Sequence, residues 1–209
     1  MNMIVLSAVI SAVVAYLLGS ISTSILVSKA MSSTDIRQHG SGNAGATNTL
    51  RVLGKKAAVF VVLGDGLKGV AAVLFAWLFD HLFKVENGVA EYVAAVFVML
   101  GHVFPLYFGF KGGKGIMTSI AVILMLSPAI GGILFAIFVV LVLAFNYISL
   151  GSVVSAACFP ILVLWLYRGN AAFFVSALII AVIAIAKHHT NISRLLKGTE
   201  SKFIKKNKH

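Results

Sequence analysis

Residues 129–145 read AIGGILFAIFVVLVLAF, seventeen positions without a charged side chain. Because a helix needs about 20 apolar residues to cross the hydrocarbon core of a bilayer, this stretch predicts a transmembrane helix. Further apolar stretches lie on both sides of it, at 3–28, 56–80, 91–109, 116–127, 148–167 and 171–187. The sequence therefore predicts an all-α fold, a polytopic bundle of about seven transmembrane helices that forms a single integral membrane domain over residues 1–209.

The composition supports a membrane protein. Of the 209 residues, 60% are hydrophobic and 11% are charged, and the mean hydropathy is +1.02, which lies outside the range of soluble domains. The stretch 116–127 is the shortest, and the Ser127-Pro128 pair at its end marks either a tight turn or a kink in one longer helix. The single cysteine, Cys158, excludes a disulfide framework and a thiolate metal site.

The basic residues are distributed unevenly over the loops. With seven spans and the N-terminus outside, fourteen of the seventeen Lys and Arg residues lie on the inner side, while Lys84 and Arg168 lie outside and Lys68 lies within a span. The positive-inside rule then predicts an outer N-terminus and a cytoplasmic C-terminus. The net charge of +11 follows this topology rather than indicating nucleic acid, and the basic tail over about 197–209 is expected to rest on anionic lipid.

Three polar, glycine-rich segments interrupt the apolar chain, and counting the spans puts all three on the inner side. The first segment, residues 40–51, offers Gly40, Gly42 and Gly45 for close approach and positive φ, the uncharged donors Ser41, Asn43, Thr47 and Asn48, and the cationic fork of Arg51. This mixture predicts an anion-binding loop that suits phosphate. The alternative is a glycine-rich turn with a helix-capping asparagine.

The second segment, FKGGKG at 110–115, sets two lysines among glycines directly before a predicted helix N-terminus. Phosphate is the natural guest of such a site; its candidate ligands are Lys111, Gly112, Gly113, Lys114 and Gly115. The GxxxxGK[ST] spacing of a Walker loop is absent. The alternative is that the lysines only anchor the inner side of the protein. His102, near the inner end of the preceding span, is expected to support this loop.

The third segment, KHHTNISR at 187–194, follows the last span. If the helix continues into the tail, Lys187, His188, Asn191 and Arg194 lie on one face. A histidine there can act as a general base near neutral pH or donate to a developing oxyanion. The alternative is a pair of interfacial histidines near the lipid headgroups.

Asp65 and Lys68 are charged residues inside a predicted span, where charges are expensive and face a partner, a bundle interior or a substrate path. Their spacing puts them on one helix face, so they form either a self-compensating ion pair or an orienting support for the site. The carboxylates on the inner side or within the spans are Asp35, Asp65 and Glu200. They are not paired in the sequence, so we expect no metal and no cofactor.

Taken together, the three segments resemble the motifs of the bacterial, membrane-integral acyl-phosphate glycerol-3-phosphate acyltransferase family. The resemblance is carried by GSGNAGATN at 40–48 with Arg51, by GHVFP at 101–105 followed by FKGGKG at 110–115, and by HxxNIxRLxxGxE at 188–200. The segment Asp65-x-x-Lys68-Gly69 also resembles part of that family, and the match runs in order from about residue 19 to residue 200. His189 departs from the pattern, since the family often has arginine there.

The resemblance implies transfer of a fatty acyl chain from acyl phosphate to the 1-hydroxyl of glycerol 3-phosphate, on the cytoplasmic face of the bacterial inner membrane. It implies that Ser41, Arg51 and Lys114 hold phosphate groups and that His188 and Asn191 lie near the reacting carbonyl, so that Ser41, His188 and Asn191 are the catalytic candidates. Arg194 is a further substrate-binding candidate, and Glu200 is a supporting residue beside His102, Asp65 and Lys68. The HxxxxD signature of acyltransferases that use acyl-CoA or acyl carrier protein is absent.

A small transporter for an anionic solute is the competing interpretation, because a short fourth span and inner lysines suit a half-helix anion site. A transporter, however, needs polar groups along a path through the membrane. The outer halves of these spans are nearly uncharged, and all three polar segments lie on one face. The sequence therefore favours the transferase.

Overall fold

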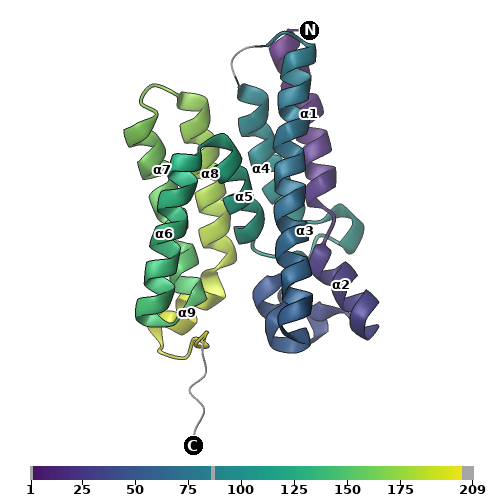
Figure 1. The fold of residues 1–209 in the computed structure, drawn as a ribbon, viewed down its shortest axis with the longest axis vertical. Coiled ribbons are helices and arrows are strands. Elements are labelled where there is room, and N and C mark those ends of the chain that lie inside the picture. Colours follow the sequence, from purple (N-terminus) through teal and green to yellow (C-terminus); the bar gives the residue numbers. More distant parts are fainter. Residues whose placement is uncertain (1, 86–87, 204–209) are drawn as a thin grey trace, which may run out of the picture. The chain divides into compact units, whose positions relative to one another are not determined.

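The computed structural model describes residues 2–85 and 88–203, and within these residues the chain is helical and without strands (Figure 1). The all-α membrane fold predicted from the sequence is confirmed. The helices are α1 (Met3–Gly19), α2 (Thr23–Ser32), α3 (Ala46–Leu82), α4 (Val89–Val103), α5 (Ile116–Leu126), α6 (Pro128–Phe145), α7 (Ile148–Leu166), α8 (Ala171–Lys187) and α9 (His189–Leu196), with short 3-10 turns η1 (Ile36–Gln38) and η2 (Leu106–Phe108).

The number of helices able to cross a membrane is smaller than the seven expected. Within the described residues, five helical stretches are long and apolar enough, and a sixth is reached if α8 and α9, bent by 59°, count as one span. Helix α8 counts as a span only together with α9. Helix α5 accounts for the remaining difference, because its 11 residues extend only about 16 Å at 1.5 Å per residue, well short of a hydrocarbon core of about 30 Å.

The chain divides into two compact units, residues 1–126 and 127–209. The boundary falls at the Ser127-Pro128 pair. Ser127 is extended (φ −155°, ψ 96°), its side chain accepts a hydrogen bond from the Ile130 amide, and proline occupies the first turn of α6. These are the features of a new helix start, so α5 and α6 are separate helices. The single domain expected from the sequence stays a prediction.

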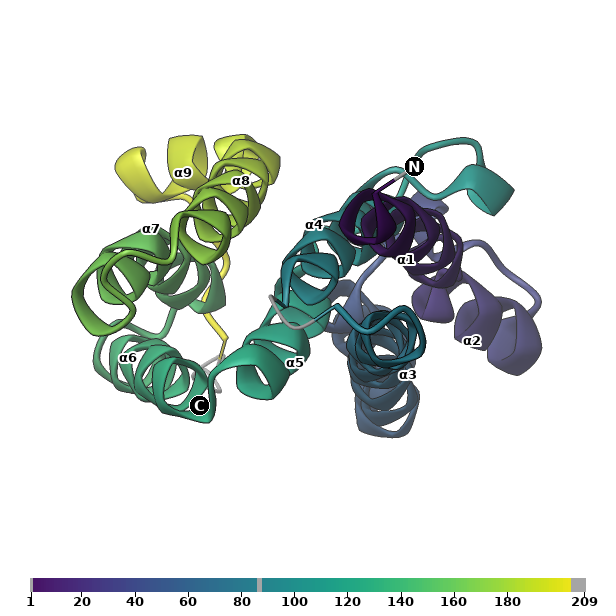
Figure 2. The same ribbon diagram turned by 90° about the horizontal axis from the view of Figure 1, so that it is seen from above.

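Close backbone contacts hold the first unit together. Helix α1 packs beside α3 and α4, as the end-on view shows (Figure 2). At Gly19 an added Cβ would collide with the Val98 carbonyl, and at Gly101 it would collide with the Tyr16 carbonyl. Small residues at these crossings let the helix backbones approach, as is common in membrane bundles. The small residues of the first span therefore include true packing positions.

The predicted span 3–28 lies within one of the candidate spans, Met3–Ser32, but the structure divides it into two helices, which corrects the expectation of one continuous helix. Helix α1 ends at Gly19 and α2 begins at Thr23. Lys68 Nζ donates to the Ile21 carbonyl oxygen at 2.8 Å, and Thr23 Oγ1 donates to Asp65 Oδ1 at 3.1 Å. Backbone groups freed by a helix break need partners in a membrane, and α3 supplies them.

Helix α3 also contains a break that the sequence interpretation did not place. Gly54 has φ +82° and ψ −175° inside the helix range Ala46–Leu82, a conformation that only glycine adopts readily. The chain before Gly54 belongs to the first polar segment, and the predicted span begins at residue 56. The glycine thus separates the site-forming turns from the membrane-crossing helix.

The second unit contains α6 to α9. Gly151 of α7 lies against Phe138 of α6, where an added Cβ would meet the phenyl ring at 2.9 Å. Phe159 of α7 and Phe173 of α8 pack edge to face with ring centroids 5.9 Å apart, a favoured aromatic geometry. These contacts pack α6, α7 and the start of α8 together in the unit that carries the third polar segment.

Candidate functional site

Asn48 organises the first polar segment. Its Oδ1 accepts a hydrogen bond from the Ser41 amide at 2.8 Å, and its Nδ2 donates to the carbonyls of Ile36 at 3.2 Å and His39 at 3.0 Å. Gly40 has φ +61°, and a Cβ at this position would collide with Asn48 Oδ1. The buried asparagine therefore holds the turn around itself, and its hydrogen bonds are made within the protein.

The remaining candidates of this segment surround that turn. Gly45 is the N-cap residue of α3 and has no side-chain cap, so the helix-capping alternative does not describe Asn48. Ser41, Gly42 and Arg51 are exposed, while Asn43, Gly45 and Thr47 are half-buried. The accessible chemistry at the start of α3 is a hydroxyl, an amide, a threonine and a guanidinium beside a helix N-terminus, which together suit an anion.

The second polar segment packs closely on the end of α4. The Gly112 amide donates to the Val103 carbonyl and the Gly113 amide to the His102 carbonyl, both at 3.2 Å. An added Cβ would collide with the His102 carbonyl at Gly112 and with the His102 ring at Gly113. These two glycines thus serve close packing on His102, and their amides are directed to α4. Lys111 is exposed and Lys114 half-buried.

A buried polar cluster lies behind this loop. Lys68 Nζ is 3.0 Å from Asp65 Oδ1, and His102 Nδ1 lies 3.6 Å from the same oxygen and 3.5 Å from Thr118 Oγ1 of α5. The ion pair, one of the two alternatives that the sequence left open, is therefore present, and it also touches the histidine against which Gly113 packs. Asp65, Lys68 and His102 connect α3, α4 and α5 behind the second segment.

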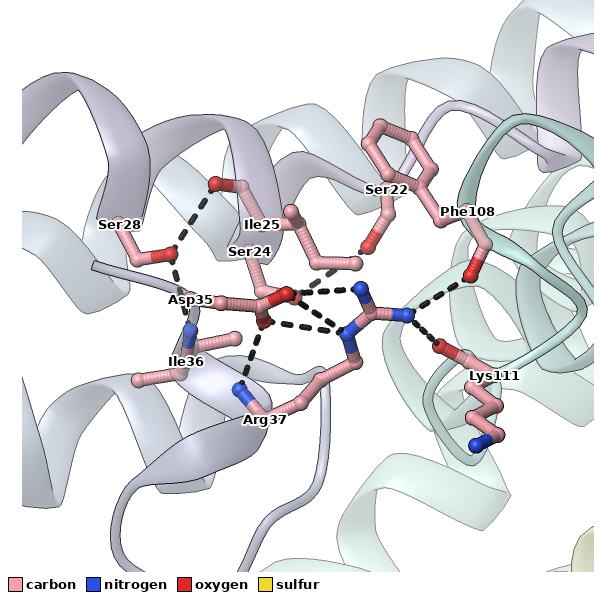
Figure 3. Close-up of polar contacts among 9 residues, drawn as sticks. All are labelled: Ser22, Ser24, Ile25, Ser28, Asp35, Ile36, Arg37, Phe108 and Lys111. Carbon is pink, nitrogen blue, oxygen red and sulfur yellow. Dashed lines mark hydrogen bonds and ion pairs between the residues drawn. The ribbon is translucent and has the colours of Figure 1, made fainter. Parts of the chain in front are cut away.

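Arg37 links the first two polar segments, and sequence reasoning missed it (Figure 3). Its guanidinium bonds the Asp35 carboxylate through Nε at 3.1 Å and Nη2 at 2.7 Å. On the other side, Nη1 donates to the carbonyls of Phe108 at 2.7 Å and Lys111 at 3.2 Å. The sequence signal was the Asp-x-Arg spacing directly before the glycine-rich segment, in which the carboxylate also accepts from the Arg37 amide.

Charge pairing locks Asp35 and Arg37 in their ionised forms. The hydrogen bond from Arg37 holds the pKa of Asp35 below its usual value, and the same bond raises the pKa of the Arg37 guanidinium. Ile25, Ile36 and Ala44 form a small buried core with Val52, Leu53 and Phe108. This core packs η1 and the first segment against α2 and η2.

The third polar segment does not continue α8 as a straight helix, which corrects the one-face expectation. The chain bends by 59° at His188, between α8 and α9. Asn191 and Arg194 still share a face of α9, and both bond Glu200: Asn191 Nδ2 to Oε1 at 2.8 Å and Arg194 Nε to Oε2 at 2.7 Å. Lys187 is the last residue of α8.

Glu200 is the centre of this segment. Besides the bonds from α9, it accepts one from Ser149 Oγ of α7 at 2.9 Å. Burial raises the pKa of Glu200, but the hydrogen bonds from Arg194, Asn191 and Ser149 outweigh burial and bring the pKa below its usual value. The carboxylate thus fixes α9 to α7 and orients Asn191 and Arg194.

His188 is buried at the bend, and the hydrogen bond of its ring defines its chemistry. Nδ1 lies 2.7 Å from the Ala184 carbonyl oxygen. Because a carbonyl only accepts, Nδ1 must carry the proton, and Nε2 is then the basic nitrogen of the neutral ring. The third segment therefore presents a histidine suited to proton transfer or oxyanion contact.

The fold and these segments define a polytopic helical membrane protein with polar, glycine-rich loops between its helices. A family model for glycerol-3-phosphate acyltransferase matches residues 9–198. The chain belongs to this glycerol-3-phosphate acyltransferase family. The family expected from the three motifs is confirmed, and it favours the transferase over the transporter.

Relatives match almost the whole chain. A glycerol-3-phosphate acyltransferase of Clostridioides difficile is 45% identical over 202 residues, covering 97% of this chain and 98% of the relative. One of Syntrophotalea carbinolica is 44% identical over 189 residues, covering 90% and 94%. The crystal structure of PlsY (YgiH), an integral membrane glycerol 3-phosphate acyltransferase in its glycerol 3-phosphate form, is similar with a TM-score of 0.84 and 35% identity, covering 95% of this chain and 96% of that chain.

Proposed function

We propose that this protein transfers a fatty acyl group from acyl phosphate to the 1-hydroxyl of glycerol 3-phosphate. The products are lysophosphatidate and inorganic phosphate, and the reaction is the first acylation step of phospholipid synthesis. The observation that carries the proposal is the family match over residues 9–198, which includes all three polar segments. A lysphosphatidic acid form of PlsY, 34% identical to this chain, supports the proposed product.

The first two segments have the chemistry to hold phosphate groups. Arg51 offers a planar fork, and Lys114 offers a compact ammonium at the start of α5. Ser41 adds an exposed hydroxyl. We assign these three residues to the substrate phosphates, with the neighbouring donors of the same loops as further contacts. A helix N-terminus carries partial positive charge, which attracts a phosphate anion and supports this assignment.

The third segment is assigned to the reacting carbonyl. The glycerol hydroxyl oxygen attacks the acyl carbonyl carbon, and the carbon–oxygen bond to phosphate breaks. We assign the hydroxyl proton to the departing phosphate, whose second pKa of about 6 makes it a weak base. His188 and Asn191 then position and stabilise the oxyanion. Because the donor is already activated, alignment and charge stabilisation are sufficient for catalysis.

The membrane location follows from the same assignment. Apolar helices hold the protein in the bilayer, and the acyl chain of the donor is expected to lie between helices or in the inner leaflet. The distribution of basic residues supports a location of the polar segments on the cytoplasmic face of a bacterial inner membrane under the positive-inside rule. Glycerol 3-phosphate would reach the site from the cytoplasm.

The decisive experiment incubates purified protein in lipid nanodiscs with acyl phosphate, in the presence and absence of glycerol 3-phosphate. Phosphate release that depends on the acceptor, with equal formation of lysophosphatidate, is expected. Parallel reactions with acyl-CoA and acyl carrier protein as donors should give no product. Acceptor-independent phosphate release, or transfer from acyl-CoA, would contradict the proposed donor.

The proton acceptor is tested by the pH dependence of kcat for wild type and His188→Asn. If the departing phosphate takes the proton, the acid limb of the profile persists in the variant, and the loss in rate reflects positioning. If His188 is the general base, the variant loses roughly 10²–10⁴ in rate and its acid limb flattens. A flattened limb in a folded variant would overturn the phosphate assignment.

A further inference from the structure

The backbone of the second polar segment adopts conformations that side-chain-bearing residues rarely take. Gly109 has φ +66° and Phe110 has φ +59°. Left-handed conformations suit glycine, but a bulky aromatic residue enters them only when its surroundings require it. The Phe110 side chain is exposed, so its own packing does not hold the backbone in this region.

Arg37 contacts the backbone on both sides of this turn. Its Nη1 donates to the carbonyl of Phe108 at 2.7 Å and to that of Lys111 at 3.2 Å. The two acceptors bracket Gly109 and Phe110. A single guanidinium nitrogen is therefore bonded to both ends of the left-handed turn. Figure 3 shows this arrangement, in which the Lys111 side chain extends away from Arg37.

We propose that Arg37 is a positioning residue that locks Gly109 and the second polar segment, residues 110–115, in the backbone conformation required to present Lys111 and Lys114 to phosphate. The inference rests on the proposed function for the role of those lysines. The lock itself rests only on the contacts of the guanidinium. It adds to the site a residue that acts through the loop without touching substrate.

The pairing of Arg37 with Asp35 argues against direct binding of phosphate by this arginine. Nε and Nη2 both face the Asp35 carboxylate, and Nη1 faces the two carbonyls. The guanidinium is thus compensated by a carboxylate and directed at protein acceptors. Arg51, by contrast, is exposed and suits a phosphate ligand. Arg37, just before the first segment, and Arg51, within it, therefore have different functions.

Arginine is the residue that this geometry requires. The planar fork reaches a carboxylate with one edge and the loop carbonyls with another nitrogen, whereas the single ammonium of lysine is a point charge on a flexible stem. An Arg37→Lys variant keeps the positive charge and loses the fixed geometry. It therefore tests the lock with the charge of the segment unchanged.

Hydrogen–deuterium exchange measures the lock directly. In wild type, the Gly112 and Gly113 amides bond α4 carbonyls at 3.2 Å, and the Phe110 amide bonds the Pro105 carbonyl at 2.9 Å. In Arg37→Lys these amides should exchange at least about tenfold faster, because the variant loses roughly one hydrogen bond to a charged group. Amides of α4 and α7 should be unaffected, which shows that the variant is folded.

Kinetics then test the consequence for the reaction. We expect Arg37→Lys to raise KM for a phosphate-bearing substrate about tenfold to hundredfold, while kcat stays within about threefold, since the reacting groups are not altered. The matched control is Lys55→Ala, which removes an exposed charge near the first segment. It should show wild-type kinetics and wild-type exchange.

Rescue distinguishes the lock from a general structural role. Glycine takes the left-handed region without strain, so Phe110→Gly in the Arg37→Lys background should recover part of the KM loss. A double variant worse than Arg37→Lys, or wild-type exchange and KM in Arg37→Lys, would overturn the proposal. If exchange rises as expected but wild-type protein transfers no acyl group from acyl phosphate, the proposed function fails and the lock stands.

Discussion

Two buried residues, Asn48 and Glu200, each organise one polar segment through three side-chain hydrogen bonds. Sequence reasoning placed Asn48 among the substrate ligands and Glu200 among the supporting residues. The structure gives both a supporting geometry. An amide that donates and accepts can close a turn or bind a ligand equally well, so residue type alone does not separate these functions.

Lys114 is the residue-scale test of phosphate binding. Changing Lys114→Ala should remove a charge-assisted contact of roughly 1.5–3 kcal/mol, or about tenfold to hundredfold in kcat/KM for glycerol 3-phosphate or acyl phosphate. Steady-state kinetics measure the loss, with Lys56→Ala as the control for net charge. Unaltered kinetics in Lys114→Ala would remove this lysine from the site.

Glu200 predicts a pH dependence of stability. Its pKa is lower in the folded protein than the ordinary value of 4.5, so the stabilisation is fully present above that value and is lost as the pH falls through the folded-state pKa. The Tm of purified wild type should therefore drop on acidification below about pH 4.5, and Glu200→Gln should show a smaller acid-induced drop. Equal acid dependence in both proteins would contradict the role of the carboxylate.

At the scale of helices, the apolar stretches were placed well by hydropathy, whereas the irregularities within them were not. The break at residues 20–22 and the bend at His188 each interrupt a stretch that looks continuous in sequence, and the break at Gly54 lies just before a predicted span. The first break depends on Lys68, which is distant in the chain, and the second on a backbone conformation. Local periodicity contains neither kind of information.

Lys68 and Asp65 predict a non-additive effect on stability. Lys68→Met leaves the Asp65 carboxylate without its ammonium and the Ile21 carbonyl without its donor, and breaking a buried pair in this way costs about 3–5 kcal/mol. The double variant Asp65→Asn/Lys68→Met should recover a substantial part of this loss. Thermal unfolding in detergent compares the stability of Asp65→Asn, Lys68→Met and the double variant. If the stability losses of the two single variants simply add up in the double variant, the two residues are not coupled.

At the scale of the whole molecule, composition was enough to predict an all-α membrane protein, and three motifs were enough to predict its family. The number of crossings was harder, because an 11-residue apolar helix such as α5 resembles a span in hydropathy but not in length. The pairing of Arg37 with the Phe108 and Lys111 carbonyls was beyond prediction. Such a contact joins residues 71 and 74 positions apart and leaves no local pattern.

Membrane orientation is the whole-molecule prediction. In a Cys158→Ala background, single cysteines at Ser33 and Ser201 should resist an impermeant thiol reagent in intact cells, and a cysteine at Arg168 should react. Permeabilised cells provide the control, in which Ser33→Cys and Ser201→Cys become labelled. Labelling of Ser201→Cys from outside would reverse the predicted cytoplasmic location of the third segment.

The hydrogen bond from Lys68 to the Ile21 carbonyl joins residues 47 positions apart, and this separation orders the events of biosynthesis. When the first apolar segment leaves the ribosome, its future break has no partner in lipid, because α3 has not been made. A nascent segment in that state satisfies its carbonyls by staying helical through residues 20–22 or by remaining near water. We therefore expect the break to be a late feature that forms when α3 enters the bilayer beside α1.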